Sequence, residues 1–356
     1  MRGAPRTAES MLATWGRRLI TIPLYTGLCV LVLGTLPLLL GVAVIIDIVR
    51  GHPWAVTRCF IFFTYYLVCE VVGICASLAT WIATGCGSAR ARFLQWNFAL
   101  ECWWAGALLR GAQVIFGMRV EVEEALDMGR GPIILFIRHA SVGDTLLPAV
   151  YVSGRYGIVL RYVLKRELLW DPCLDIVGNR LLNCFVRRGS GESAHEIALV
   201  KELMENLGPQ DGVLIYPEGT RFTPAKRTRI LQRLAEKGDA PALVKAAALQ
   251  HVLPPRLGGT LALLECNAGA DAVFCAHVGF EGAGSFHDLI NGSLVHCRIR
   301  VRFWRVPYAE IPGDAAARAE WLHEQWMRVD EWVGHRLPRL AATSPEVSLL
   351  TAGTEM

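Results

Sequence analysis

The chain has 356 residues, of which 53% are hydrophobic and 19% are charged, whereas a typical soluble domain has roughly 25% charged residues. Its formal net charge is +4, and its mean hydropathy is +0.35. This composition excludes an intrinsically disordered protein, which combines low hydrophobicity with high net charge. The small net charge gives no indication of a nucleic-acid partner. A purely soluble enzyme is disfavoured as well, because so many apolar residues do not fit into one water-facing core.

Two long apolar segments near the N-terminus predict a membrane anchor. Residues 20–46 contain no charged residue. This segment is long enough to span a ~30 Å hydrocarbon core and too long for the apolar region of a signal peptide. Residues 59–84 form the second segment, and Glu70 is their only charge. A carboxyl at this depth is either functional or simply protonated or interfacial. Because Pro23 and Pro37 kink the first helix, the sequence leaves open a spanning hairpin and a re-entrant hairpin that dips into one leaflet.

Arginine residues around these segments indicate an orientation. The bias favours a cytoplasmic location for both ends of the hairpin and for the rest of the chain. The basic residues that flank the hairpin are Arg2, Arg6, Arg17, Arg18, Arg90 and Arg92, and its connecting turn holds Arg50 and Arg58. The chain has 31 arginines and five lysines, a ratio typical of GC-rich bacterial genomes, so we expect the bacterial inner membrane. The eleven cysteines include no C-x-x-C pair, which favours reduced thiols in a reducing compartment.

The composition changes along the chain and predicts five segments. They are a basic tail (1–18), a two-helix membrane anchor (19–84), an amphipathic helix at the membrane interface (85–117), an α/β domain (118–340) and a C-terminal tail (341–356). In the α/β domain, short apolar runs typical of buried strands alternate with helical stretches. The predicted strands are residues 133–137, 158–163, 184–186, 213–216, 272–278 and 298–303, and helices are predicted at 193–207 and 315–337. The predicted fold class is therefore α/β, with a mixed sheet flanked by helices and preceded by a membrane-embedded helical hairpin.

The first candidate site follows the predicted strand 133–137. His139 precedes Asp144 by five positions, and on a regular helix this spacing would place the two side chains on different faces. They meet only if the chain turns between them, which Gly143 permits. A histidine oriented by a carboxylate is a general-base pair, although this spacing also arises by chance.

Two further groups of polar residues also follow apolar runs. Residues 216–221 read Y-P-E-G-T-R, a tight loop whose backbone amides and arginine are suited to an anion. Lys165 and Arg188 lie at the ends of two other apolar runs. Each group taken alone is equally explained as an ordinary turn or as solvated charges at a strand end.

Taken together, these residues resemble the glycerolipid acyltransferase family. Its members share H-x-x-x-x-D, then F-[IV]-x-R, then E-G-T-R, and then a proline after a strand. Here these elements are matched by His139 to Asp144 with Ser141 between them, by Arg188, by Glu218-Gly219-Thr220-Arg221 and by Pro254. The resemblance extends over about residues 119–306 and is greatest to the 1-acyl-glycerol-3-phosphate acyltransferases.

The resemblance implies a reaction and a set of roles. A fatty acyl group passes from acyl-CoA or acyl carrier protein to the free hydroxyl of 1-acyl-glycerol-3-phosphate (lysophosphatidic acid), which gives phosphatidic acid for phospholipid biosynthesis. His139 is then the base and Asp144 orients it. The implied substrate-binding residues are Lys165, Arg188, Glu218, Gly219, Thr220 and Arg221. The reaction needs no metal and no cofactor beyond the acyl donor, and the bilayer supplies the acceptor.

One residue departs from the family pattern, and three alternatives accompany the resemblance. Many members have Asn before the catalytic histidine, where this chain has Arg138, and this extra cation suggests a different anionic headgroup. An acyltransferase for another lysolipid, such as a lyso-ornithine lipid or lysocardiolipin, would share every motif. A catalytically silent membrane scaffold would use the His139–Asp144 pair only as a structural hydrogen bond. A lipid hydrolase would need a nucleophile that the sequence does not show.

Overall fold

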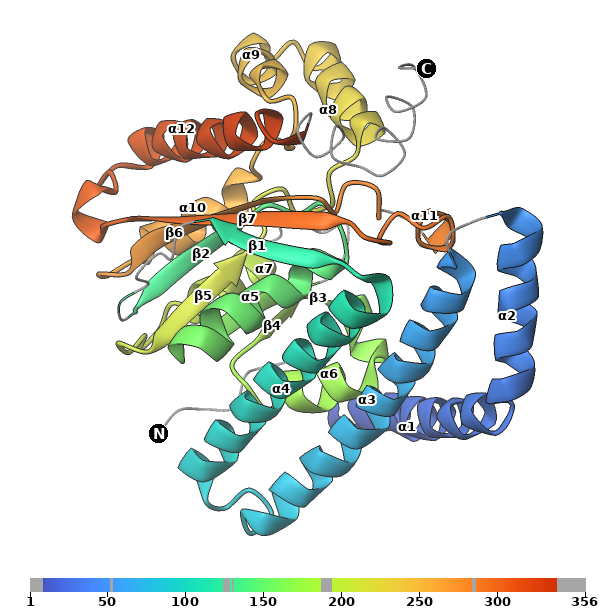
Figure 1. Ribbon diagram of the computed structural model, residues 1–356. Helices are drawn as coiled ribbons and strands as arrows, with labels where there is room; N and C mark the ends of the chain where they lie inside the picture. The colour runs from blue at the N-terminus through green and yellow to red at the C-terminus, as the bar shows by residue number, and fades with distance from the viewer. Residues whose placement is uncertain are drawn as a thin grey trace, which may run out of the picture.

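The computed structural model describes residues 9–51, 54–123, 129, 131–186, 194–283 and 286–337. An α/β body surrounds one sheet, and a layer of long N-terminal helices packs against it (Figure 1). Within the described residues the sheet has seven strands in the order β1-β7-β6-β2-β5-β3-β4. The strands are β1 (Arg119–Glu123), β2 (Ile133–Ile137), β3 (Val159–Lys165), β4 (Cys184–Val186), β5 (Asp211–Ile215), β6 (Asp271–Val278) and β7 (Arg298–Val306). Only β6 and β7 pair antiparallel, so the mixed sheet predicted from the sequence is confirmed.

Helices cover both faces of the sheet. Every residue of β2 and of β5 is buried, as expected for central strands between two helical layers. One face packs against α7 (Ala194–Glu202), α10 (Leu257–Glu265) and α12 (Ala315–Gly334). The other face packs against α4 (Arg90–Phe116) and a helical segment made of η1 (Gly143–Thr145), α5 (Leu146–Pro148) and η2 (Ala149–Gly154). The remaining helical elements are η3 (Arg166–Trp170), α6 (Pro172–Gly178), α8 (Pro224–Glu236), α9 (Ala240–Ala248), α11 (Phe286–Ile290) and η4 (Tyr308–Glu310).

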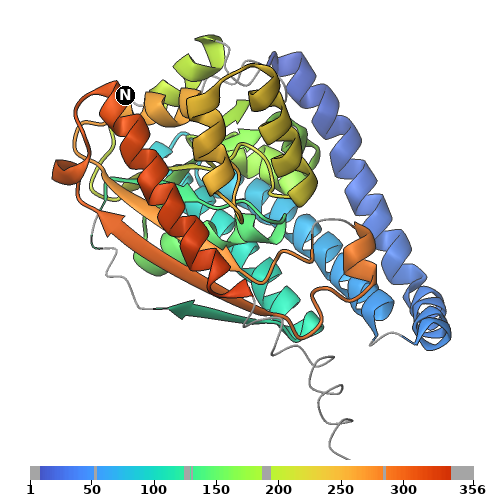
Figure 2. The ribbon, with the colours of Figure 1, turned by 90° about the horizontal axis from the view of Figure 1, so that it is seen from above.

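The N-terminal apolar segments form three helices. The uncharged run 20–46 is divided between α1 (Met11–Gly34) and α2 (Leu36–Arg50), and the break at Thr35 lies just ahead of Pro37. The second run forms α3 (Ala55–Ala83). Of the described helices, α1 and α3 are long and apolar enough to cross a membrane. Both views place α1 and α2 at the margin of the molecule (Figures 1 and 2), where they expose many large apolar side chains.

Both ends of the α1–α2 unit contact the α/β body. At the start of α1, Arg17 and Arg18 form ion pairs of 2.7 and 2.8 Å with the buried carboxylate of Asp175 in α6. At the end of α2, Arg50 donates a hydrogen bond to Asn291, just after α11. A hairpin that spanned the bilayer would place Arg50 about 30 Å from the body. These contacts hold both ends of the α1–α2 unit against the body, with Thr35 between the two helices.

The segment predicted to lie at the membrane interface, residues 85–117, contains α4, and α4 lies between α3 and the sheet. Leu109, Ala112 and Phe116 on one side of α4 belong to the core beneath the sheet. Trp96 and Trp103 are exposed on another side. The side of α4 that faces the sheet therefore packs against protein, and the location of this segment at the membrane interface stays a prediction. The predicted C-terminal tail, 341–356, and residues 1–8 of the predicted basic tail lie outside the described residues.

Candidate active site

The candidate site lies where two adjacent parallel strands end. β2 and β5 are hydrogen-bonded neighbours, and the carboxyl ends of parallel strands meet at one edge of a sheet. His139 follows β2 and Glu218 follows β5. The backbone N–H of Phe222 donates to the carbonyl of His139 at 2.7 Å and joins the two loops. The sheet order thus brings together two motifs that are 79 residues apart in the sequence.

His139 and Asp144 meet because the chain turns between them. The His139 Nδ1 atom lies 3.1 Å from Asp144 Oδ1. The turn needs a residue without a side chain at Gly143, because a Cβ atom there would lie 2.8 Å from the ring of Phe280. Asp144 is fully buried and its Oδ2 atom accepts the backbone N–H groups of Ala140 and Ser141 at 2.7 and 2.8 Å. With Nδ1 facing this carboxylate, the assigned tautomer leaves the Nε2 lone pair of His139 to act as the base.

The groups around His139 restrict what it can do. The ring of Tyr216 packs on the imidazole with 4.6 Å between ring centroids, which fixes the plane of the imidazole. The Ser141 hydroxyl donates to the Ala283 carbonyl at 3.0 Å and accepts the Gly143 N–H at 3.3 Å. Because this hydroxyl makes no hydrogen bond to His139, the geometry favours a base that acts on an external hydroxyl over a serine nucleophile.

Glu218 has backbone partners that the sequence did not predict. Its side chain is buried, and its two oxygens accept the backbone N–H groups of His139 at 2.8 Å and Leu253 at 2.9 Å. Burial raises the pKa of Glu218 to about 8, while these amides and the Arg138 guanidinium act in the opposite direction. The sequence assigned Glu218 to substrate binding. In the structure its oxygens instead join the segments of His139 and Leu253, and a contact of Glu218 with substrate stays a prediction.

The other predicted substrate-binding residues are only partly brought together. Arg221 lines the cavity described below. Gly219 has a left-handed backbone (φ 63°) and packs against Arg256, and the Thr220 hydroxyl accepts a hydrogen bond from Lys226 Nζ at 3.0 Å. Lys165 is the last residue of β3. Its neighbour Leu164 lines the cavity. Successive side chains of a strand point to opposite faces, Lys165 is not among the described cavity-lining residues, and its role in substrate binding stays a prediction. Arg188 lies outside the described residues, and its role stays a prediction.

Arg138 is structural in this fold. Its side chain is fully buried, and its guanidinium donates to the carbonyls of His277 (2.6 Å) and His251 (3.0 Å) and to Glu281 (2.5 Å). A cation enclosed in this way does not reach an acceptor headgroup. The sequence-based suggestion that Arg138 alters headgroup choice is therefore wrong, and the residue joins three segments behind the dyad.

Sequence reasoning missed His277 and Glu281, which lie behind the dyad. His277 Nε2 donates to the Arg138 carbonyl at 2.8 Å and lies 3.6 Å from Asp144 Oδ2. Burial lowers the pKa of His277, so this imidazole is neutral beside the Asp144 carboxylate. Glu281 also accepts the Gly279 N–H. Both residues lie about 140 positions from the dyad, and only their position at the end of the predicted strand 272–278 gave any signal.

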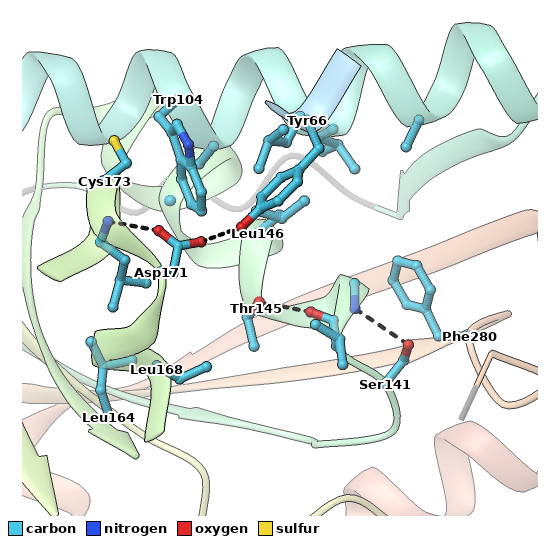
Figure 3. A pocket seen from close by; sticks show the side chains of 18 of the residues that line it. Tyr66, Trp104, Ser141, Thr145, Leu146, Leu164, Leu168, Asp171, Cys173 and Phe280 are labelled. Carbon is cyan, nitrogen blue, oxygen red and sulfur yellow. Dashed lines mark hydrogen bonds between the residues drawn. The ribbon is translucent and has the colours of Figure 1, made fainter. Parts of the chain in front are cut away.

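A cavity of about 820 Å³ extends from this site between the sheet and helices α3, α4 and α6. Its walls are mainly apolar, with Leu108, Leu146 and Leu164 among the lining residues. Figure 3 shows Ser141 and Phe280 at one end, and Trp104, Asp171 and Cys173 at the other. An apolar cavity of this size, with polar groups at one end, is suited to a small amphipathic ligand. Among the described residues no group of three or more His, Cys, Asp or Glu side chains could hold a metal ion.

Comparisons with known proteins agree with this geometry. Residues 117–256 match the model of a family described as Acyltransferase. The chain is 24% identical over 224 residues to 1-acyl-sn-glycerol-3-phosphate acyltransferase epsilon of Mus musculus, covering 59% of each protein. It is 26% identical over 207 residues to the gamma protein of the same organism, covering 57% of this chain and 52% of the relative. The chain thus spans little more than half the length of these curated relatives.

A solved structure supports the fold. The crystal structure of the 1-acyl-sn-glycerophosphate (LPA) acyltransferase PlsC from Thermotoga maritima superimposes with a TM-score of 0.53 and 13% identity, covering 77% of this chain and 95% of that one. At this identity the likeness concerns the fold alone. The sequence-based resemblance to glycerolipid acyltransferases, in particular to those acting on 1-acyl-sn-glycerol-3-phosphate, is confirmed.

Proposed function

Residues 117–256 belong to the acyltransferase family, and from this premise we propose that the protein transfers a fatty acyl group from a thioester donor to the free hydroxyl of 1-acyl-glycerol-3-phosphate. The product would be phosphatidic acid. The observation that carries the proposal is the position of the His139–Asp144 dyad beside a largely apolar cavity of about 820 Å³. Ser141 and Tyr216, which neighbour His139, line the cavity, and this supports a base close to the thioester carbonyl of an acyl chain held there.

The reaction requires one base and no covalent acyl-enzyme. His139 Nε2 removes the proton of the acceptor hydroxyl while the hydroxyl oxygen attacks the thioester carbonyl carbon. The C–O bond forms, the C–S bond breaks, and the proton passes from the imidazolium to the leaving thiolate. Asp144 stabilises the imidazolium through Nδ1. The hydrogen bond from Ser141 to Ala283 supports direct transfer, because it leaves that hydroxyl without a base.

Arg221 is the cation that supports a phosphorylated acceptor. Of the predicted phosphate ligands that the structure describes, Arg221 lines the cavity. Ser141 and Tyr216 line the same cavity. A guanidinium binds phosphate through paired, charge-assisted hydrogen bonds whose geometry Lys does not reproduce. We therefore assign the acceptor phosphate to Arg221, with Arg188 as a further predicted contact.

The test uses detergent-purified protein, a labelled acyl-CoA or acyl carrier protein thioester, and a panel of lysolipids. We expect label in phosphatidic acid, and a poor reaction with a lysolipid that lacks a terminal phosphate, such as a lyso-ornithine lipid. His139→Ala should lose about 10²–10⁴ in kcat, while His335→Ala, a control at an exposed position, should keep it. Label transferred preferentially to another lysolipid would refute the assigned acceptor.

Arg221→Lys separates acceptor binding from chemistry. If the phosphate is held equally in the ground and transition states, the KM for lysophosphatidic acid rises while kcat changes little. The donor KM should stay the same. A rise in the donor KM alone would move Arg221 to the phosphates of coenzyme A.

We also propose that α1 and α2 insert as a re-entrant unit into one leaflet, with the α/β body on the cytoplasmic face of the inner membrane. The contacts of Arg17, Arg18 and Arg50 with the body support this arrangement. An epitope inserted after Gly51 should then be accessible on the same side as a C-terminal reporter. Accessibility from the opposite side would indicate a spanning hairpin.

A further inference from the structure

The inner wall of the cavity carries polar groups that no described residue satisfies. Glu101 of α4 and Tyr162 of β3 both line the cavity. The buried Oε2 atom of Glu101 and the Tyr162 hydroxyl make no hydrogen bond. The hydroxyl of Ser153 in η2 lies close to that of Tyr162, yet it too is buried without a hydrogen bond of normal geometry. Glu101 is also close enough to Tyr162 to act on it electrostatically, so three elements contribute polar groups to the same part of the molecule.

Other polar side chains of the same cavity have partners. The Tyr66 hydroxyl donates to Asp171 at 2.7 Å, and the Asn183 side chain accepts the Tyr162 N–H and donates to the Gly178 carbonyl. Unsatisfied groups are therefore not a general property of this wall. Buried polar groups in folded proteins almost always have a partner, and an exception calls for an unseen ligand or water.

The polar region lies on the path that a chain would follow inward from the dyad. Tyr162 pairs with Leu214, two residues before Tyr216, whose ring packs on His139. At about 3.3 Å per strand residue, Tyr162 lies roughly 7 Å from the level of Tyr216, measured along the strands toward their amino ends. Tyr162, Leu214 and Tyr216 belong to the same core layer, so the two tyrosines face the same side of the sheet.

We propose that Glu101 and Tyr162 bind a hydroxyl group carried on the acyl chain, so that the preferred donor is a hydroxylated fatty acyl thioester. This inference rests on the proposed function. A hydroxyl has one donor and two acceptor positions, so it donates to the Glu101 carboxyl and accepts from the Tyr162 O–H. An unsubstituted chain would leave both groups buried without partners, which is the basis of strong discrimination by polar sites.

The Glu101 carboxyl is suited to this environment. Burial raises its pKa to about 8, so the group is largely neutral at pH 7 and places no bare charge in the cavity. In this form it can both accept and donate a hydrogen bond.

The test measures binding without turnover. A fluorescent fatty acid bound to the purified protein in detergent is displaced by free fatty acids of one chain length, either unsubstituted or with a hydroxyl near the carboxyl end, at mid-chain or at the terminal carbon. We expect one hydroxylated isomer to displace the probe at about tenfold lower concentration than the unsubstituted acid, as expected for one to two net hydrogen bonds. Equal displacement by all of them would overturn the proposal.

Three variants locate the effect. Tyr162→Phe and Glu101→Leu should each bring the ratio between hydroxylated and unsubstituted acids close to one. Tyr66→Phe is the matched control, because it removes a cavity hydroxyl that already has a partner in Asp171, and it should keep the ratio. A ratio that persisted in both Tyr162→Phe and Glu101→Leu would overturn the assignment. A preference in binding without acyl transfer would support this inference and contradict the proposed function instead.

Discussion

The buried carboxyl groups of the loop that carries His139 differ from Glu101, on the inner wall of the cavity, in how completely they are hydrogen-bonded. Asp144 accepts two backbone amides and faces the His139 ring, and Glu218 accepts two further amides. Glu101, on the wall, has a buried oxygen without any partner among the described residues. Carboxyl groups whose hydrogen bonds are complete hold a backbone in place. A carboxyl group whose hydrogen bonds are incomplete is available to a ligand.

The two regions also differ in whether the hydrogen-bonding groups belong to the backbone or to side chains. In the catalytic loop the partners are mainly backbone N–H groups, so Asp144 and Glu218 set the path of the chain before a substrate arrives. Such preorganisation means that little rearrangement is needed during the reaction. On the cavity wall, the groups come from side chains of separate elements, α4 and β3, and their arrangement is complete only with an occupant.

The largest effect should come from Asp144→Asn, which tests the catalytic loop. If the amide NH2 takes the place of Oδ2, it faces the N–H groups of Ala140 and Ser141, and these two backbone donors lose their acceptor. If it takes the place of Oδ1, it faces the protonated Nδ1 of His139 and disfavours the active tautomer. We expect a loss of about 10²–10⁴ in kcat, measured with lysophosphatidic acid. Asp239→Asn, at an exposed helix cap, is the control, and near-normal turnover of Asp144→Asn would contradict the role given to the dyad.

Glu218→Gln should have an intermediate effect and sharpen the distinction between positioning and binding. The amide NH2 replaces one acceptor of the pair that holds the N–H groups of His139 and Leu253. We expect the free energy of unfolding to fall by about 1–3 kcal/mol, with a loss of kcat smaller than for Asp144→Asn. Denaturation in detergent and steady-state kinetics measure both. An unchanged stability with a raised acceptor KM would instead return Glu218 to the substrate-binding role that the sequence predicted.

The sequence predicted most of the sheet, and the reason is physical. Six strands were found because central strands covered on both faces have nearly continuous apolar runs. β1, R-V-E-V-E, lies at the edge of the sheet and contains no continuous apolar run, and it was missed although its alternation of charged and apolar residues is typical of a half-buried strand. The break between α1 and α2 was foreseen only as a kink at Pro37.

The site was predicted less completely than the fold. The motifs identified His139 and Asp144, although their spacing alone suggested opposite helix faces. The motifs did not show that Glu218 turns inward, or that Lys165 ends β3 beside, and not among, the cavity-lining residues. The contacts of Arg138, and the cavity itself, depend on segments more than 100 residues apart, and no local pattern encodes such contacts.

The smallest effect on kcat should appear in Glu101→Gln, whose pH-dependent stability tests whether the wall carboxyl truly lacks a partner. Burial raises the pKa of Glu101 from 4.5 to about 8. Between these two values the folded chain keeps the proton and the unfolded chain releases it, so the wild type loses stability as the pH rises from about 4.5 to about 8. Above pH 8 both states are ionised and the loss is complete. Glutamine does not titrate, so the melting temperature of Glu101→Gln relative to the wild type should rise across this window and level off on both sides. A difference that stays constant with pH would mean that Glu101 has a partner that stabilises its charge, and the role proposed for Glu101 would then lose its basis.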